Sequence, residues 1–379
     1  MFMRGFKSQE EFGDFLIAKG VTGGGVMQMS GKGVLNILEI PEIDTRAANI
    51  LKQECLSIGA ELALPKEAAG FKQGKVWGAL ILTNKQAEKL YEKLQAQPFG
   101  LKDLAQEMRD ILGNYGRTEF ALKSPHGREV SLENTQVMGI CNATPDSLFD
   151  GGSVREMIEA GASIIDIGGE STGPGSKDVS GGEELERVLP IITEVRRDFP
   201  DVFISIDTYK ADVAANAIEA GVDMVNDVTA GRGDERMFSV VSDLEVPYIM
   251  MYAKDATART TTDEVEYEDV MRTIIEFLES RVQSLGSNVI VDPGMGAFVS
   301  GNPRYSYEIL SRLDELRVLG CPVLVGASRK SFLGGEVSDR LEGSLAAACA
   351  AAMNGAKIIR AHDVEQTVKA LKVCNNLYK

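Results

Sequence analysis

Short apolar runs rich in β-branched residues alternate with amphipathic stretches over the last two-thirds of the chain. A polar or glycine-rich turn follows each run, and apolar residues at helical spacing follow each turn. The eight runs span residues 137–142, 163–168, 202–208, 224–228, 247–252, 289–294, 322–328 and 357–363. Runs that are apolar on both faces and alternate with helices are typical of a parallel (β/α)₈ barrel. We therefore predict an α/β fold, a TIM barrel, over residues 136–379.

A doubly wound open sheet shares this alternation, but the positions of the polar residues favour the barrel. Polar side chains fall near the carboxyl ends of runs that are otherwise apolar, at Asn142, Asp166, Asp207, Asn226, Asp292, Arg360 and His362. In a closed barrel these ends converge on one mouth, whereas in an open sheet only the strands beside the switch point meet a ligand. The sequence thus predicts a functional site at the carboxyl-terminal mouth.

Residues 1–130 follow a different pattern. Strand-like "GVLNILEI", "VWGALILT" and "TEFALK" are interleaved with helix-like "DTRAANILKQECLSIGAEL", "NKQAEKLYEKLQ" and "LKDLAQEMRDILGN", which predicts a small α+β domain. The polar segment "SPHGREVSLENTQ" is the predicted linker. The three glycines at 23–25 lack the spacing of a nucleotide site, so we interpret them as a flexible turn.

Composition and charge narrow the class of function. The chain has 379 residues, 44% of them hydrophobic, and a formal net charge of -16, so we expect two globular domains and neither nucleic acid nor membrane as a partner. The apolar runs are too short or too alanine-rich for a membrane span, and the amino terminus has no apolar signal-peptide stretch, so we expect a cytoplasmic protein. Its five scattered cysteines and two isolated histidines indicate reduced thiols and no zinc site.

Carboxylate and amide side chains at the strand ends would suit a pterin. The pyrimidine edge of a pterin presents adjacent N–H donors, which a carboxylate accepts bidentately. Asp207 in "SIDTYK" and Asp292 in "VDPGMG" would serve, and Asn226 in "VNDV" offers both a donor and an acceptor. Each alone is more commonly a helix cap. Together they favour a ligand site.

A basic cluster follows the seventh and eighth runs. The segments "ASRKSFLGG" and "IIRAHD" place at adjacent strand ends Ser328, Arg329, Lys330, Ser331, Arg360 and His362. Barrels often build phosphate sites there. In so acidic a chain this cluster indicates a phosphate or pyrophosphate ligand, although Arg329 would also fit a surface ion pair. His362 would also fit a buried structural histidine, and its place beside Arg360 favours anion binding.

Seven segments resemble, in order, the motifs of dihydropteroate synthases. They are "VMGICNATPDSLFDGG", "IIDIGGESTGPGS", "ISIDTYK", "VNDV", "VDPGMG", "GASRKSFLGG" and "IIRAHDV". The resemblance covers nearly all of the predicted barrel, and the amino-terminal domain is similar to an extension of longer members. It implies a transferase of folate biosynthesis that joins 6-hydroxymethyl-7,8-dihydropterin pyrophosphate to an arylamine, usually p-aminobenzoate, and releases pyrophosphate to give 7,8-dihydropteroate.

The resemblance also implies roles for individual residues. The pterin would be lined by Asp207, Asn226, Asp292 and Lys330. The pyrophosphate would be held by Asn142, Arg360 and His362, with the cofactor Mg²⁺ bridging to Asn142. Candidates on the acceptor side are Thr172, Pro174 and Ser331. Catalysis by Asp207, Lys330, Asp292 and Asn142 would stabilise charge in a dissociative transition state. Members of the family are commonly homodimers, so we expect a homodimer.

Three departures from the family pattern lie on the acceptor side. Gly173 in "STGPG" replaces an arginine, "AFVS" at 297–300 replaces an aromatic-Gly-Lys segment, and "IMMYAKDATARTT" replaces Met-His-Met-x-Gly. The acceptor therefore stays open. We favour p-aminobenzoate, and the alternative is 4-(β-D-ribofuranosyl)aminobenzene 5'-phosphate of the tetrahydromethanopterin pathway, whose phosphate Lys254 and Arg259 would reach. A corrinoid-linked methyltransferase and a non-catalytic pterin-binding protein are disfavoured because the basic cluster is retained.

Overall fold

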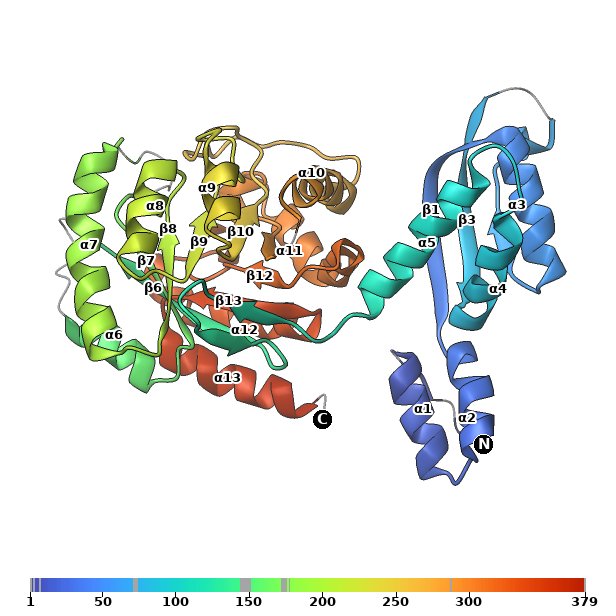
Figure 1. Cartoon of the computed structure of the whole chain (residues 1–379), viewed down its shortest axis with the longest axis horizontal. Coiled ribbons are helices and arrows are strands. Elements are labelled where there is room, and N and C mark those ends of the chain that lie inside the picture. The colour runs from blue at the N-terminus through green and yellow to red at the C-terminus, as the bar shows by residue number, and fades with distance from the viewer. Residues whose placement is uncertain are drawn as a thin grey trace. The chain divides into compact units, whose positions relative to one another are not determined.

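The computed structural model divides the chain into two compact units, Met1–Arg117 and Thr118–Lys379 (Figure 1). The structure describes residues 1–379 except 1, 3, 7, 71–73, 144–150, 172–175, 177, 287 and 378–379. Within the described part of the chain, no helix combines the length and the apolar character that a membrane span needs.

The amino-terminal unit is a small antiparallel sheet that shares one apolar core with the helices that follow β1 in the chain. The strands β1 (Leu35–Asp44), β2 (Glu61–Ala63) and β3 (Lys75–Thr83) lie in the order β1-β3-β2. The helices are α1 (Gln9–Ala18), α2 (Gly23–Met29), α3 (Thr45–Ser57), α4 (Asn84–Leu94) and α5 (Leu101–Gly116), with 3₁₀ turns at Ser30–Lys32 and Lys66–Gly70. Side chains of α3, α4 and α5 pack with the sheet. This confirms the predicted α+β arrangement.

The prediction of a flexible turn at residues 23–25 is wrong. These glycines form the first turn of α2, where the Thr22 hydroxyl accepts a hydrogen bond from the Gly25 N–H at 3.4 Å. A cap of this kind satisfies one of the N–H groups left unpaired at a helix start, and it offsets part of the low helix propensity of glycine.

The second unit is the predicted closed barrel of eight parallel strands. The strands are β6 (Gln136–Asn142), β7 (Ile164–Gly168), β8 (Phe203–Asp207), β9 (Met224–Asp227), β10 (Tyr248–Met251), β11 (Val289–Asp292), β12 (Val323–Val325) and β13 (Ala356–Ala361). They follow one another around the barrel in chain order, and β13 pairs with β6 to close it. This closure excludes the open sheet.

Helices surround the barrel in the order that the alternating pattern predicts (Figure 1). They are α6 (Gly151–Glu159), α7 (Gly181–Asp198), α8 (Ala211–Glu219), α9 (Met237–Asp243), α10 (Val270–Leu285), α11 (Arg304–Ser311), α12 (Leu341–Met353) and α13 (Val364–Leu377). Short 3₁₀ helices are η3 (Gly296–Phe298), η4 (Leu313–Leu319), η5 (Ser331–Leu333) and η6 (Val337–Asp339). The main apolar core lies between these helices and the strands.

The interior of the barrel changes from apolar to polar along the strands. Every strand contributes one buried apolar residue to a central layer, namely Met138, Ile164, Phe203, Met224, Ile249, Ile290, Leu324 and Ile358. Side chains alternate between the two faces of a strand, so residues two positions further along also face inward. They include Asp166, Ser205, Asn226, Asp292 and Arg360. The polar residues therefore form a layer directly above an apolar floor.

A hairpin closes the opposite end of the barrel. Strands β4 (Ala121–Lys123) and β5 (Glu129–Ser131) pair antiparallel, and Leu122 and Leu132 pack against the central apolar layer. Ser124 and Arg128 donate to Asp223, each at 2.6 Å. The segment "SPHGREVSLENTQ" is thus not a linker. The boundary between the two compact units falls after Arg117, earlier in the chain than the predicted boundary near residue 130.

Candidate active site

Arg360 reaches across the barrel interior and pairs with two carboxylates. Its Nε donates to Oδ2 of Asp166 at 2.6 Å, and its Nη2 donates to Oδ2 of Asp207 at 2.7 Å. Burial lowers the pKa of Arg360, but the two carboxylates raise it by more, so its pKa is raised overall. The guanidinium therefore remains charged in a position that spans the mouth from β13 to β7 and β8.

Asp207 ends β8 in an environment that disfavours its charge. Burial raises the pKa of Asp207 to about 7; the guanidinium of Arg360 opposes the rise, and the carboxylate of Asp166 adds to it. A carboxylate normally titrates near 4. Asp207 thus exchanges its proton close to neutral pH, which is unusual for a surface aspartate and common at functional sites.

Asp292 and Lys330 are two further charged groups of the mouth, each affecting the pKa of the other. Asp292 ends β11 and accepts a hydrogen bond from the Gly294 N–H at 2.8 Å. Burial raises the pKa of Asp292 to about 6 against the opposing effect of Lys330. Burial lowers the pKa of Lys330 to about 8 against the opposing effect of Asp292. Because Arg360 lowers the pKa of both groups as well, the three charges share one mouth.

Lys330 is held in place by neutral partners. Its Nζ donates to the carbonyl oxygen of Met295 at 3.0 Å and lies 5.0 Å from the ring centroid of Phe298. A cation over an aromatic face is stabilised by the ring quadrupole. The segment "AFVS", which departs from the family pattern, therefore supplies an aromatic ring to the site.

Asn226 joins the network through Asp166. Its Nδ2 donates to Asp166 Oδ2 at 3.0 Å, and its Cα is in register with that of Asp207. The structure thus brings together five of the predicted site residues, namely Asp207, Asn226, Asp292, Lys330 and Arg360. The sequence marked Asp166 as a strand-end polar residue but gave it no role. Its only signal was a lone acid in the apolar run "SIIDIG".

The other predicted site residues lie at the rim or outside the described part. Asn142 ends β6 with its side chain exposed. His362 is exposed just after β13, and its N–H and Nδ1 lie 3.2 and 3.0 Å from Ser328 Oγ. Desolvation and the charges of Arg360 and Arg329 lower the pKa of His362. Ser331 begins η5, directly after Lys330. Thr172 and Pro174 lie outside the described residues.

Three other basic residues that the sequence singled out form ion pairs with nearby carboxylates. Arg329 pairs with Asp363 on the surface, with N–O distances of 2.5 and 3.0 Å. Lys254 is 5% exposed and donates to Asp255, Thr260 and Thr261. Arg259 pairs with Glu170 and Asp178. The structure therefore gives no support to the expected contact of Lys254 and Arg259 with an acceptor phosphate.

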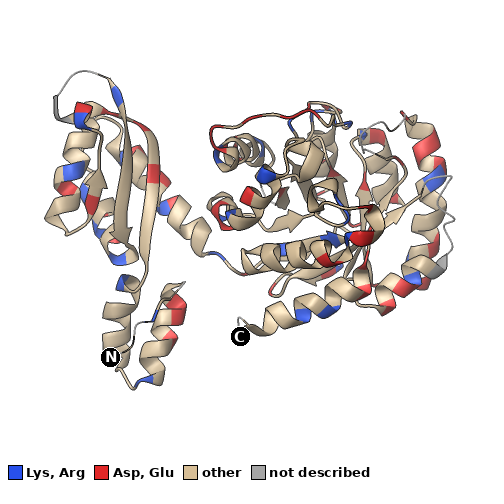
Figure 2. Cartoon of the chain, turned by 180° about the vertical axis from the view of Figure 1, so that it is seen from behind, with Lys and Arg blue, Asp and Glu red and all other residues tan. Residues whose placement is uncertain are grey.

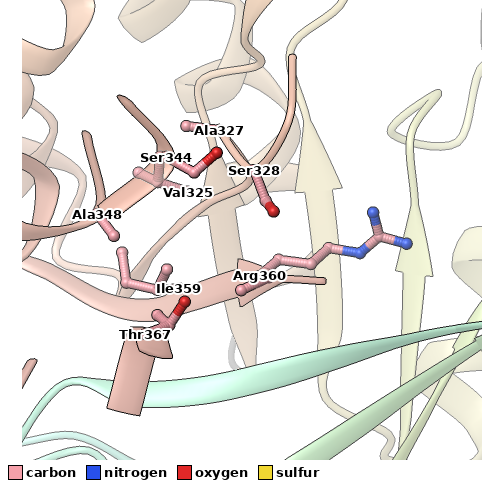
Figure 3. Close-up of a pocket in the computed structure, with 9 residues that line it drawn as sticks. Val325, Ala327, Ser328, Ser344, Ala348, Ile359, Arg360 and Thr367 are labelled. Atoms are coloured by element: carbon pink, nitrogen blue, oxygen red, sulfur yellow. The ribbon is translucent and has the colours of Figure 1, made fainter. Parts of the chain in front are cut away.

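A small cavity lies behind the mouth. It holds about 10 Å³, which is room for about one water molecule. Hydroxyl groups of Ser328, Ser344 and Thr367 line it, and the guanidinium of Arg360 extends away from these side chains (Figure 3).

Acidic residues are spread along the outer helices and loops (Figure 2). Basic residues are spread over the outer helices as well, whereas Arg360 and Lys330 are partly buried at the mouth.

The donor groups fit a magnesium ion that binds together with a phosphate ligand. Within the described ranges, no three His, Cys, Asp or Glu side chains gather where they would hold a metal. Mg²⁺ usually keeps several waters and takes one or two protein oxygens together with substrate phosphates. The amide oxygen of Asn142, at the rim of the mouth, would supply one such ligand.

Known proteins similar to this chain include dihydropteroate synthases. Residues 138–362 match the family described as pterin binding enzyme. The dihydropteroate synthase of Streptococcus pyogenes is 38% identical over 66% of this chain and 98% of its own length. The solved Yersinia pestis dihydropteroate synthase with a sulfonamide drug is 34% identical, with a TM-score of 0.62 over 68% of this chain and 99% of that chain.

A longer relative also matches the amino-terminal unit. The probable bifunctional folylpolyglutamate synthase/dihydropteroate synthase of Halobacterium salinarum is 39% identical over 97% of this chain and 46% of its own length. The chain thus spans less than half of that relative. Because the match covers 97% of this chain, it includes most of residues 1–117, so this relative carries a segment similar to the amino-terminal unit.

Proposed function

Because this chain belongs to the pterin-binding enzyme family, and within it to the dihydropteroate synthases, we propose that it condenses 6-hydroxymethyl-7,8-dihydropterin pyrophosphate with p-aminobenzoate. The products are 7,8-dihydropteroate and pyrophosphate. One observation carries the proposal most directly. The mouth of a chain with net charge -16 holds the cations Arg360 and Lys330 beside Asp207, Asp292 and Asn226.

The pterin half of the site is built from hydrogen-bonding side chains whose orientations are fixed by neighbouring residues. Asp207 and Asp292 accept from the N–H donors of the pterin edge, and Asn226 offers its carbonyl oxygen because its amide N–H is already given to Asp166. Lys330, stacked on Phe298, approaches the same ligand. Hydrogen bonds in such a buried site contribute strongly because little water competes.

The pyrophosphate half uses Arg360, His362 and Asn142. The guanidinium supplies fixed charge, and His362 supplies a donor beside Ser328. A Mg²⁺ ion held by Asn142 would neutralise charge on the leaving pyrophosphate. These groups stabilise charge that grows on the departing oxygen, which is where a preorganised site lowers the barrier most.

The reaction needs no covalent enzyme intermediate. The bond from the pterin methylene carbon to the pyrophosphate oxygen breaks, and its electron pair leaves with pyrophosphate. The amine nitrogen of p-aminobenzoate forms the new C–N bond and gives its proton to solvent. Asp207 and Asp292, when ionised, stabilise the positive charge that develops on the ring. The family resemblance makes Ser331, Thr172 and Pro174 the acceptor-side candidates, and of these the structure describes Ser331, which begins η5.

The proposed function is tested by offering both acceptors to the purified protein. It receives the dihydropterin pyrophosphate with p-aminobenzoate or with 4-(β-D-ribofuranosyl)aminobenzene 5'-phosphate, with and without Mg²⁺. We expect magnesium-dependent pyrophosphate release with p-aminobenzoate. Preference for the ribosyl phosphate acceptor would overturn the choice of acceptor, and pterin binding without turnover would overturn the catalytic assignment.

We propose a cytoplasmic homodimer, as is common in the family. Light scattering on the purified chain tests the dimer, and fractionation of the source cells tests the location.

A further inference from the structure

We propose that Asp166 is a positioning residue of this site, which fixes the orientation of both Asn226 and Arg360 through a single carboxylate oxygen. The proposal rests on the proposed function, because it is there that Asn226 and Arg360 receive the pterin and the pyrophosphate. Asp166 itself is not assigned to any ligand.

We call the contacts of Asp166 with Arg360 and Asn226 the Asp166 clamp. Oδ2 of Asp166 accepts from Nε of Arg360 at 2.6 Å and from Nδ2 of Asn226 at 3.0 Å. Around the barrel, β7 stands two strands from β13 on one side and two strands from β9 on the other. One oxygen thus ties together side chains that begin on strands four positions apart.

The clamp decides what Arg360 offers to a ligand. Asp166 occupies Nε and Asp207 occupies Nη2. No hydrogen bond from the described residues reaches Nη1. Because a guanidinium is planar, holding two of its nitrogens fixes the direction of the third. Arg360 therefore presents Nη1 in one direction, ready for an anionic oxygen.

The clamp also decides which end of the Asn226 amide faces the ligand. An ionised carboxylate accepts hydrogen bonds and cannot donate them. Asn226 must therefore turn its NH₂ group toward Asp166, which leaves its carbonyl oxygen for the other side. Among the described donors, none reaches that carbonyl oxygen. A ligand N–H is the partner that this orientation selects.

Burial shows that this arrangement is costly to keep. Asp166 is fully buried, and its second oxygen, Oδ1, has no partner in the part of the chain that the structure describes. An apolar residue of similar size in such a position is often no less stable than a buried charge. The carboxylate is thus better explained by what it does to Arg360 and Asn226 than by a gain in stability.

The chain offers a matched control. Ser205 is in register with Asp166 on the neighbouring strand, is fully buried and also has a side-chain oxygen without a described partner. It makes no contact with Arg360 or Asn226 among the described hydrogen bonds. Ser205→Ala therefore reports the general cost of a change in this layer.

The test compares Asp166→Asn, Asp166→Ala and Ser205→Ala in the full chain. Calorimetry measures binding of 6-hydroxymethylpterin, and kinetics measure kcat and KM for the dihydropterin pyrophosphate. In Asp166→Asn the amide of residue 226 is free to flip, so we expect pterin binding to weaken at least about 10-fold and kcat/KM to fall by roughly 100-fold. Ser205→Ala should change both by less than about 3-fold.

A pH profile separates positioning from a loss of folded protein. Burial is the main cause of the raised pKa of Asp207; Asp166, Glu184 and Asp227 add to it, and Arg360 opposes it. Removing the charge of Asp166 should move the acid limb of kcat/KM to lower pH, whereas a smaller folded fraction would scale the whole profile. Unchanged pterin binding and an unchanged acid limb in Asp166→Asn would overturn the proposal.

Calorimetry reports pterin binding without requiring turnover. If the wild-type protein binds pterin but releases no pyrophosphate, the proposed function fails, and the calorimetric comparison still decides the role of Asp166. If Asp166→Ala does not fold, the isosteric Asp166→Asn carries the test.

Discussion

Three titratable side chains at the mouth have pKa values that converge on the neutral range. Burial raises the pKa of Asp207 to about 7 and that of Asp292 to about 6, and it lowers the pKa of Lys330 to about 8. The proposed mechanism needs both carboxylates ionised and the ammonium protonated. All three conditions are met together only in a narrow window.

This window predicts a bell-shaped pH dependence of kcat/KM with its maximum between about pH 7 and pH 8. As pH falls through about 7, Asp207 gains its proton and loses the charge that stabilises the ring. As pH rises through about 8, Lys330 loses its proton. Initial rates at low concentrations of the pterin substrate measure the profile. A rate that keeps rising from pH 7 to pH 10 would contradict these roles.

The individual residues of the site were predictable from the sequence, but the hydrogen bonds between them were not. Asp207, Asn226, Asp292, Lys330 and Arg360 stand at strand ends in an otherwise apolar pattern, so a closed barrel brings them together. The contact of Arg360 with Asp166 joins residues 194 positions apart in the chain. No local pattern encodes such a pairing, because it depends on the diameter of the barrel and the rotamer of the arginine.

At the scale of elements, the hairpin strand β4 lies in the predicted strand segment "TEFALK", but β5 lies in the predicted linker and was missed because the hairpin has few apolar residues. Its apolar residues, Leu122, Val130 and Leu132, are few and are spread over a turn of charged and small residues. The decisive contact is again distant, since Asp223 accepts from Ser124 and Arg128 of the hairpin and from Arg196 of α7. The barrel helices, by contrast, carry local periodicity and were predicted.

The buried carboxylate of Asp223 predicts a large effect on stability. Asp223→Ala would leave Arg128 and Arg196 without their partner, and breaking a buried ion pair of this kind lowers the free energy of unfolding by about 3 to 5 kcal/mol. Urea unfolding measures the change. The control is Asp212→Ala, which removes an exposed partner of Arg236. Equal midpoints for the two variants would contradict a structural role for the hairpin contact.

At the scale of the whole molecule, the candidate site belongs to the second unit alone. Every described residue of the site lies between Asn142 and His362, within the part of the chain that matches the family. The Streptococcus pyogenes relative is covered at 98% of its length by a match to 66% of this chain. The amino-terminal unit has its own apolar core.

We therefore expect residues 118–379, produced alone, to fold and to turn over substrate within about 3-fold of the full chain. The hairpin β4–β5 must be included, because it covers the apolar floor of the barrel. Circular dichroism and kcat/KM measure the two properties. A folded fragment without activity would show that the amino-terminal unit contributes to the reaction.

In the proposed mechanism, the charges at the mouth, and not those around it, carry pyrophosphate release. Lys330 and Arg329 are neighbours in sequence with the same charge, but Lys330 faces Asp292 in the mouth and Arg329 pairs with Asp363 on the surface. The most direct measurement is pyrophosphate release with p-aminobenzoate by the variants Lys330→Ala and Arg329→Ala. We predict that Lys330→Ala loses at least about 100-fold in kcat/KM while remaining folded and that Arg329→Ala stays within about 3-fold of wild type. Near-wild-type release by folded Lys330→Ala would contradict this role of Lys330.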